Sequence, residues 1–159
     1  MLDKLEGPDV VPRGLLLGWA LWWSVVVLSN VTDLLQTLGL LGPEFTWTSG
    51  NYGMMAEGSG GGGPGLIAFF AFGIAWEALS AGLFWRAVRQ WRTPGGRRAA
   101  RVAFAVSVAF WFAFLIANEL ALLHKSGDGP LVHWIIFTAQ VVSFLAMGRL
   151  DDPPETAAT

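Results

Sequence analysis

Residues 65–85 read GLIAFFAFGIAWEALSAGLFW, an apolar segment in which Glu77 is the only charged side chain. A helix of about 20 apolar residues is long enough to cross the roughly 30 Å hydrocarbon core of a bilayer. The segment therefore predicts a membrane-spanning helix with a carboxyl group near its middle. Such a group costs roughly 2.5–3.5 kcal/mol on insertion scales and usually faces a bundle interior or a wet cavity.

Three further stretches have the same character, in a chain of 159 residues that is 53% hydrophobic and 14% charged. Residues 15–37 contain one charge, Asp33, residues 102–123 contain Glu119, and residues 130–148 contain none. The sequence therefore predicts an all-α, multi-pass membrane protein. Its expected architecture is one four-transmembrane-helix bundle over residues 1–150, followed by a short polar tail, residues 151–159.

The charges of the connecting segments predict the topology. The connection at residues 86–101 is rich in arginine, whereas the connection at residues 42–64 has two glutamates and no lysine or arginine. The positive-inside rule places the arginine-rich segment and both termini in the cytoplasm. The same side chains could also contact anionic lipid headgroups. They are Arg86, Arg89, Arg92, Arg97, Arg98 and Arg101.

The first connection, residues 42–64, combines an aromatic part with a run of glycines. The glycine run, residues 60–63, is typical of a flexible spacer. The aromatic side chains Phe45, Trp47 and Tyr52 favour an anchor lying on the membrane interface, and a ligand lid is the alternative.

Small residues at helical spacing predict close helix packing in lipid. Gly14 and Gly18 form one such pair, and five alanines repeat at every fourth position of the third span. They could pack within the bundle or against another subunit. The alanines are Ala105, Ala109, Ala113, Ala117 and Ala121.

Polar groups from all four spans are expected in the outer half of the bundle. They are Asn30, Asp33, Glu77, Asn118, Glu119 and His133. They could bind a proton, a cation or a small outer-leaflet ligand, or simply hydrogen-bond one another. Asp33, Glu119 and His133 could together hold a divalent metal, and His124 with His133 could hold a haem.

Some of these motifs resemble a known family, the bacterial "predicted small integral membrane protein" family, domain of unknown function 2165. The resemblance lies in Asn30-Val31-Thr32-Asp33, in residues 74–81 around Trp76-Glu77, and in Trp111-Phe112 followed by Glu119. Residues 117–120 depart from the family's pattern. The resemblance implies a four-span protein of the bacterial cytoplasmic (inner) membrane in which the acids matter, and it implies no reaction.

These features favour a non-catalytic accessory subunit of a larger membrane complex, respiratory or photosynthetic. The alternative is a small carrier or binding protein that uses the acidic pocket, and a haem or metal redox protein is a weaker one. The chain has no cysteine, HExxH motif or dinucleotide fingerprint, so an enzyme is not favoured. The expected partners are membrane lipid and other integral membrane subunits, and not nucleic acid.

Overall fold

The computed structural model describes residues 10–120 and 129–149, and these form five helices and no strand. Their bounds are α1 Val10–Thr37, α2 Asn51–Gly58, α3 Pro64–Gln90, α4 Gly96–Leu120 and α5 Gly129–Arg149. All except α2 are long and apolar enough to cross a membrane. The all-helical fold and the four expected spans are therefore confirmed, and the chain is a multi-pass membrane protein.

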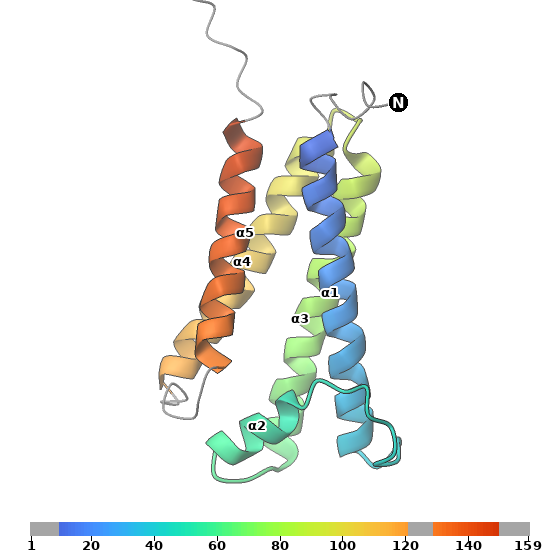
Figure 1. Cartoon of the computed structure of the whole chain (residues 1–159), viewed down its shortest axis with the longest axis vertical. Coiled ribbons are helices and arrows are strands. Elements are labelled where there is room, and N and C mark those ends of the chain that lie inside the picture. The colour runs from blue at the N-terminus through green and yellow to red at the C-terminus, as the bar shows by residue number, and fades with distance from the viewer. Residues whose placement is uncertain (1–9, 121–128, 150–159) are drawn as a thin grey trace, which may run out of the picture.

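The four long helices form a bundle that is closed at one end and open at the other. Helix α1 packs along α3, α3 packs on α4, and α4 packs on α5. Figure 1 shows α1 and α3 side by side, while α4 and α5 diverge from them toward the end that carries α2. We call this the α2 end, and the opposite end, where α3 connects to α4, the arginine end.

The core mixes small and large side chains along its length. Toward the arginine end, small residues such as Ala103 let the helices approach closely, and the buried rings of Phe84 and Phe104 pack edge-on with centroids 5.0 Å apart. Toward the α2 end, the rings of Trp76 and Phe110 have centroids 5.8 Å apart.

Buried tryptophan N–H groups join the helices where the closed part meets the open part. Trp23 Nε1 of α1 donates to Ser107 Oγ of α4 at 3.0 Å, and Ser107 Oγ donates to Gln140 Oε1 of α5 at 2.6 Å. Trp76 Nε1 of α3 donates to the carbonyl of Val106 at 3.1 Å. Interhelical hydrogen bonds in lipid each contribute about 0.6 kcal/mol on average. Together these bonds fix the register of the four long helices between the closed and the open part of the bundle.

The arginine-rich segment is mostly helical, which corrects the expectation of a connection covering residues 86–101. Helix α3 continues to Gln90 and α4 begins at Gly96, so of the six arginines only Arg92 lies between helices. All six are exposed and lie at the arginine end of α3 and α4. Long charged side chains at helix ends extend toward the membrane interface, so the helices can continue past the apolar segment.

The predicted packing residues divide into two groups. Gly14, Gly18, Ala105 and Ala109 are exposed, and a Cβ atom built on either glycine would meet nothing within 4 Å among the described residues. These four positions therefore do not pack against another described helix and face lipid or another molecule. In contrast, Ala113 and Ala117 line an internal cavity of the bundle, and Ala121 lies outside the described residues.

The first connection is more ordered than a flexible spacer. Helix α2 occupies Asn51–Gly58, and Gly60 and Gly61 adopt φ angles of +79° and +144° in the turn that follows. Glycine tolerates positive φ because it has no Cβ atom. Pro64 then starts α3, at a position where a missing N–H leaves no hydrogen bond unmade. The glycine run thus makes the tight return from α2 to α3.

Candidate functional site

Asp33 holds α2 in place. The N-cap residue of α2, Gly50, has no side chain to accept a hydrogen bond from the first N–H groups of the helix. Asp33 Oδ2 of α1 takes this role, accepting from the backbone N–H of Tyr52 at 3.1 Å and from Ser49 Oγ at 2.7 Å. A carboxylate near a helix N-terminus also opposes the positive end of the helix dipole. Asp33 is therefore a structural anchor for α2.

Neighbouring polar side chains of α1 fix the rest of the connection. Thr32 Oγ1 donates to the carbonyl of Trp47 at 2.9 Å. Gln36 Nε2 donates to the carbonyls of Gly42 and Phe45 at 3.1 and 3.2 Å. These bonds satisfy backbone groups that the irregular segment would otherwise leave unpaired near the membrane. They place α2 across the open end of the bundle.

Replacing Asp33 with alanine should release α2. The helix then loses its acceptor, and local opening should be favoured by roughly 1–2 kcal/mol, or about 5- to 30-fold. Limited chymotrypsin digestion of the purified protein should show faster cleavage between residues 45 and 52. The control is Glu57→Ala, which changes an exposed acid on α2 itself. Equal cleavage rates in the two variants would contradict the anchoring role.

The second polar group joins α1, α2 and α3 around Glu77. Asn30 Nδ2 donates to both carboxylate oxygens of Glu77, at 2.9 and 2.8 Å. Asn30 Oδ1 accepts in turn from Asn51 Nδ2 at 2.9 Å. Asn30 and Glu77 are only 2% and 7% exposed. A buried carboxylate of α3 is thus linked to α2 through one amide of α1.

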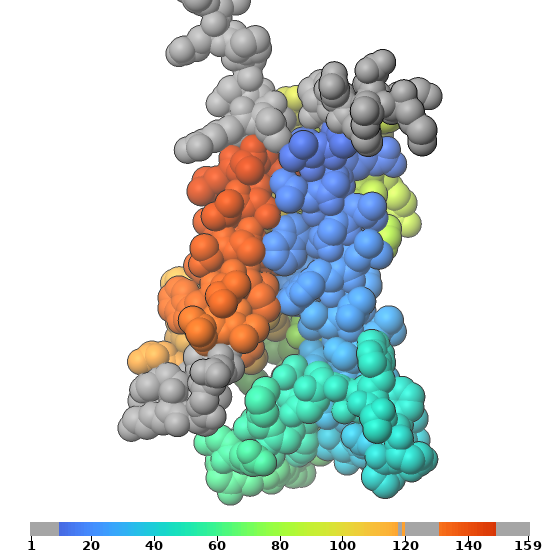
Figure 2. All heavy atoms as spheres, in the orientation of Figure 1, coloured from blue at the N-terminus to red at the C-terminus, as the bar shows by residue number. Residues whose placement is uncertain are grey.

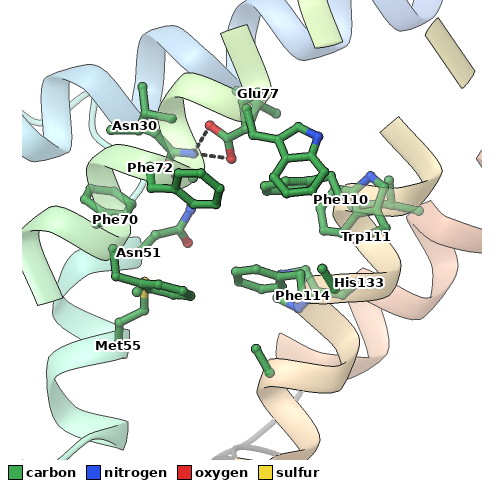
Figure 3. Close-up of a pocket in the computed structure, with 18 of the residues that line it drawn as sticks. Asn30, Asn51, Met55, Phe70, Phe72, Glu77, Phe110, Trp111, Phe114 and His133 are labelled. Atoms are coloured by element: carbon green, nitrogen blue, oxygen red, sulfur yellow. Dashed lines mark hydrogen bonds between the residues drawn. The ribbon is translucent and has the colours of Figure 1, made fainter. Parts of the chain in front are cut away.

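Glu77 and Asn30 lie in the wall of a cavity of about 350 Å³ between the two helix pairs. Figure 3 shows them across the cavity from Phe114 and His133, with Phe110 and Trp111 alongside. In Figure 2, a hollow separates α5 from the α2 segment at this end of the molecule. Eight of the described aromatic side chains, from α1, α3 and α4, line this cavity. They are Trp22, Phe69, Phe70, Phe72, Trp76, Phe110, Trp111 and Phe114.

The opposite wall holds His133 firmly among aromatic rings. Its ring centroid lies 5.4 Å from that of Trp111 and 4.8 Å from that of Phe114, the latter in an edge-on arrangement. Helix α2 closes part of the cavity with Asn51, Met54 and Met55. Since methionine is flexible and polarizable, it adapts to differently shaped partners. The cavity therefore has aromatic side chains on several sides and methionines of α2 on one side.

The structure brings together only part of the expected polar set. Asn30, Glu77 and His133 line the cavity, whereas Asp33 binds α2 and the exposed Glu119 lies outside the cavity wall. The side chain of Asn118 is not among those described. The spacing of these residues along the helices does not show which of them line the cavity and which bind α2. Asn51 was not expected at the site, because its sequence context indicated only a loop.

The expected metal set is not assembled. No group of three or more His, Cys, Asp or Glu side chains that could hold a metal occurs among the described residues. Asp33, Glu119 and His133 therefore do not form the expected centre, since Asp33 binds the start of α2 and the exposed Glu119 lies outside the cavity wall that contains His133. His124, the other expected haem ligand, lies outside the described residues, so the haem hypothesis stays a prediction.

Comparison of the chain with protein-family models, with curated proteins and with solved structures finds no match. The resemblance drawn from the Asn30–Asp33 and Trp76–Glu77 motifs accordingly stays a prediction. The chemistry of the cavity is the remaining guide to function.

Proposed function

We propose that this protein binds a small amphipathic molecule in the cavity between its helix pairs. The observation that carries this proposal is a cavity of about 350 Å³ with aromatic walls and a buried carboxylate, Glu77. Ligand pockets commonly have volumes of roughly 300–1,000 Å³ and apolar walls with a few well-placed polar groups. A molecule with an apolar body and one polar group matches this lining.

The lining favours binding or carriage over covalent chemistry. Among the described lining residues there is no serine, threonine, cysteine or lysine that could act as a nucleophile. Glu77 is held by Asn30. His133 is packed between rings on the facing wall. These groups can orient a ligand and pair with its polar part.

The arginines favour an outward-facing entrance. With the arginine end in the cytoplasm, as the positive-inside rule requires, α2 and the mouth of the cavity lie on the outer side of a bacterial inner membrane. A ligand would then enter from the outer leaflet or the outer aqueous phase, beside α2.

Blocking the cavity tests this proposal. Ala113 of α4 lines the cavity, so Ala113→Trp should fill it without touching the Asn30–Glu77 pair. Native mass spectrometry of the protein extracted in mild detergent should find a bound small molecule in the wild type and lose it in this variant. Ala109→Trp, one turn away and outside the cavity wall, is the matched control. An adduct that survives Ala113→Trp would contradict the proposal.

A second candidate is the accessory subunit of a larger membrane complex, respiratory or photosynthetic. The observation that favours it is the exposed pair Ala105 and Ala109 on α4, both outside the cavity wall. Small residues on a lipid-facing surface allow another helix to approach closely. The same detergent extract should then contain partner proteins in stoichiometric amounts, and Ala105→Leu should release them. A monodisperse, isolated chain would count against this candidate.

A further inference from the structure

The cavity wall carries one carboxylate, that of Glu77, and no cationic lysine or arginine among the described residues. The hydrogen bonds from Asn30 are the contacts that the carboxylate has within the described structure. A buried charge is normally paired with an opposite charge. Here either a proton or a cation that enters from outside must complete the pair.

We infer that the ligand is an organic cation, with a charged nitrogen that pairs with Glu77 and a hydrocarbon body that packs on the surrounding rings. This inference rests on the binding function proposed above and specifies the chemical class of the ligand. It depends on two independent features of the cavity, the unpaired acid and the aromatic faces.

The aromatic side chains suit a cation with spread or alkylated charge. The face of an aromatic ring attracts a cation within about 6 Å of its centroid, and tryptophan does so most strongly. Trp22, Trp76 and Trp111 all line the cavity. Indole rings of α1, α3 and α4 therefore line the same cavity as Glu77, and sites that recognise alkylated ammonium groups likewise use aromatic side chains.

The same walls offer too few oxygen ligands for a metal ion. Divalent calcium takes about six to eight oxygen ligands, and magnesium needs near-ideal octahedral oxygens. Asn30 Oδ1 already accepts from Asn51, which leaves the Glu77 carboxylate as the main oxygen donor of the described wall. An alkylated ammonium group needs no such shell. The cavity therefore selects an organic cation over a bare ion.

Binding of the cation should compete with protons for one carboxylate. When Glu77 is protonated, arrival of the cation gives an ion pair and releases one proton to water, so charge is conserved. Among the described lining residues, the titratable groups are Glu77 of α3 and His133 of α5, while α1 and α2 contribute the amides of Asn30 and Asn51. Affinity should rise with pH until Glu77 is fully ionised. His133 acts in the same direction, because its charged form would repel the ligand.

Two probes of equal shape isolate the effect of charge. Benzyltrimethylammonium and neopentylbenzene differ in one atom, a charged nitrogen in place of a carbon. Binding to the full-length protein in uncharged nanodiscs can be followed by quenching of tryptophan fluorescence. We expect the wild type to bind the cation about tenfold more tightly than the hydrocarbon, a difference within reach of an ion pair and cation–π contacts.

The variant Glu77→Gln should lower affinity for the cation about tenfold, leave affinity for the hydrocarbon nearly unchanged, and remove most of the pH dependence. Glu119→Gln, which changes an exposed acid outside the cavity wall, should behave as wild type. A pH dependence that survives Glu77→Gln and disappears in His133→Phe would overturn the role of Glu77.

The remaining outcomes separate this inference from the proposed function. If both probes bind equally and Ala113→Trp abolishes their binding, the proposal of a cationic ligand is overturned and the binding function stands. Binding of neither probe at millimolar concentration would overturn both. If Glu77→Gln fails to fold, the wild-type comparison of the two probes decides the question alone, since they differ only in charge.

Discussion

Replacing Asn30 with leucine should lower the free energy of unfolding by roughly 3 kcal/mol. Asn30 is the side chain that donates to both oxygens of Glu77, at 2.9 and 2.8 Å, and both residues are buried. Leucine has a similar shape but no donor, so the carboxylate would remain buried without its hydrogen bonds. Denaturation in mixed detergent micelles, followed by circular dichroism, measures the loss.

The double variant Asn30→Leu with Glu77→Leu provides the decisive comparison. Removing both members of a buried polar pair is far less damaging than removing one, so the double variant should recover most of the lost stability. Asn51→Leu is the comparison, because it leaves the neutral Asn30 Oδ1 without its donor but keeps both bonds to the Glu77 carboxylate, so it should cost only about 1 kcal/mol. A double variant as unstable as Asn30→Leu alone would show that the loss of stability does not come from the unpaired Glu77 carboxylate.

Replacing Trp111 with alanine should lower the free energy of unfolding by roughly 3–5 kcal/mol. Trp111 is only 5% exposed, and its ring lies within 6 Å of the ring centroids of Trp22, Trp23 and Phe110. Its removal leaves a void where α1 meets α4 and merges that void with the cavity. The same denaturation measurement reports this loss.

Trp134→Ala is the matched control for Trp111→Ala. Trp134 is 52% exposed and faces outward from α5, so its removal leaves a surface that lipid or detergent can cover. Its cost should be below about 1 kcal/mol. Similar losses in the two variants would mean that Trp111 is not part of a packed aromatic wall. Trp111→Phe should restore part of the stability, since a ring still fills most of the volume.

Most of the membrane architecture could be predicted from the chain. The four long apolar segments predict four spans, because a helix rises 1.5 Å per residue and the hydrocarbon core has a known thickness. Glu77 stood out for the same reason, since its depth follows from counting residues along 65–85. Asn30 and Asp33 were correctly placed on one helix near the same end.

Their partners could not be predicted. Asp33 and Glu77 looked like members of one acidic cluster, yet Asp33 binds the start of α2 while Glu77 binds Asn30. The difference depends on the aromatic part of the first connection, for which composition favours an interfacial anchor. Once α2 forms, its unpaired N–H groups need an acceptor, and Asp33 lies where it can supply one.

The sequence by itself predicted four long apolar helices, the position of Glu77 near the middle of one of them and the end of the molecule that carries the arginines, because hydropathy and charge act on each segment independently. Only the tertiary structure decided which faces meet. In a soluble helix an apolar stripe marks the buried face, but lipid is as apolar as a protein core, so membrane helices carry no such mark. The helices α4 and α5 diverge from α1 and α3 toward the α2 end (Figure 1), and the cavity around Glu77 lies between these two pairs.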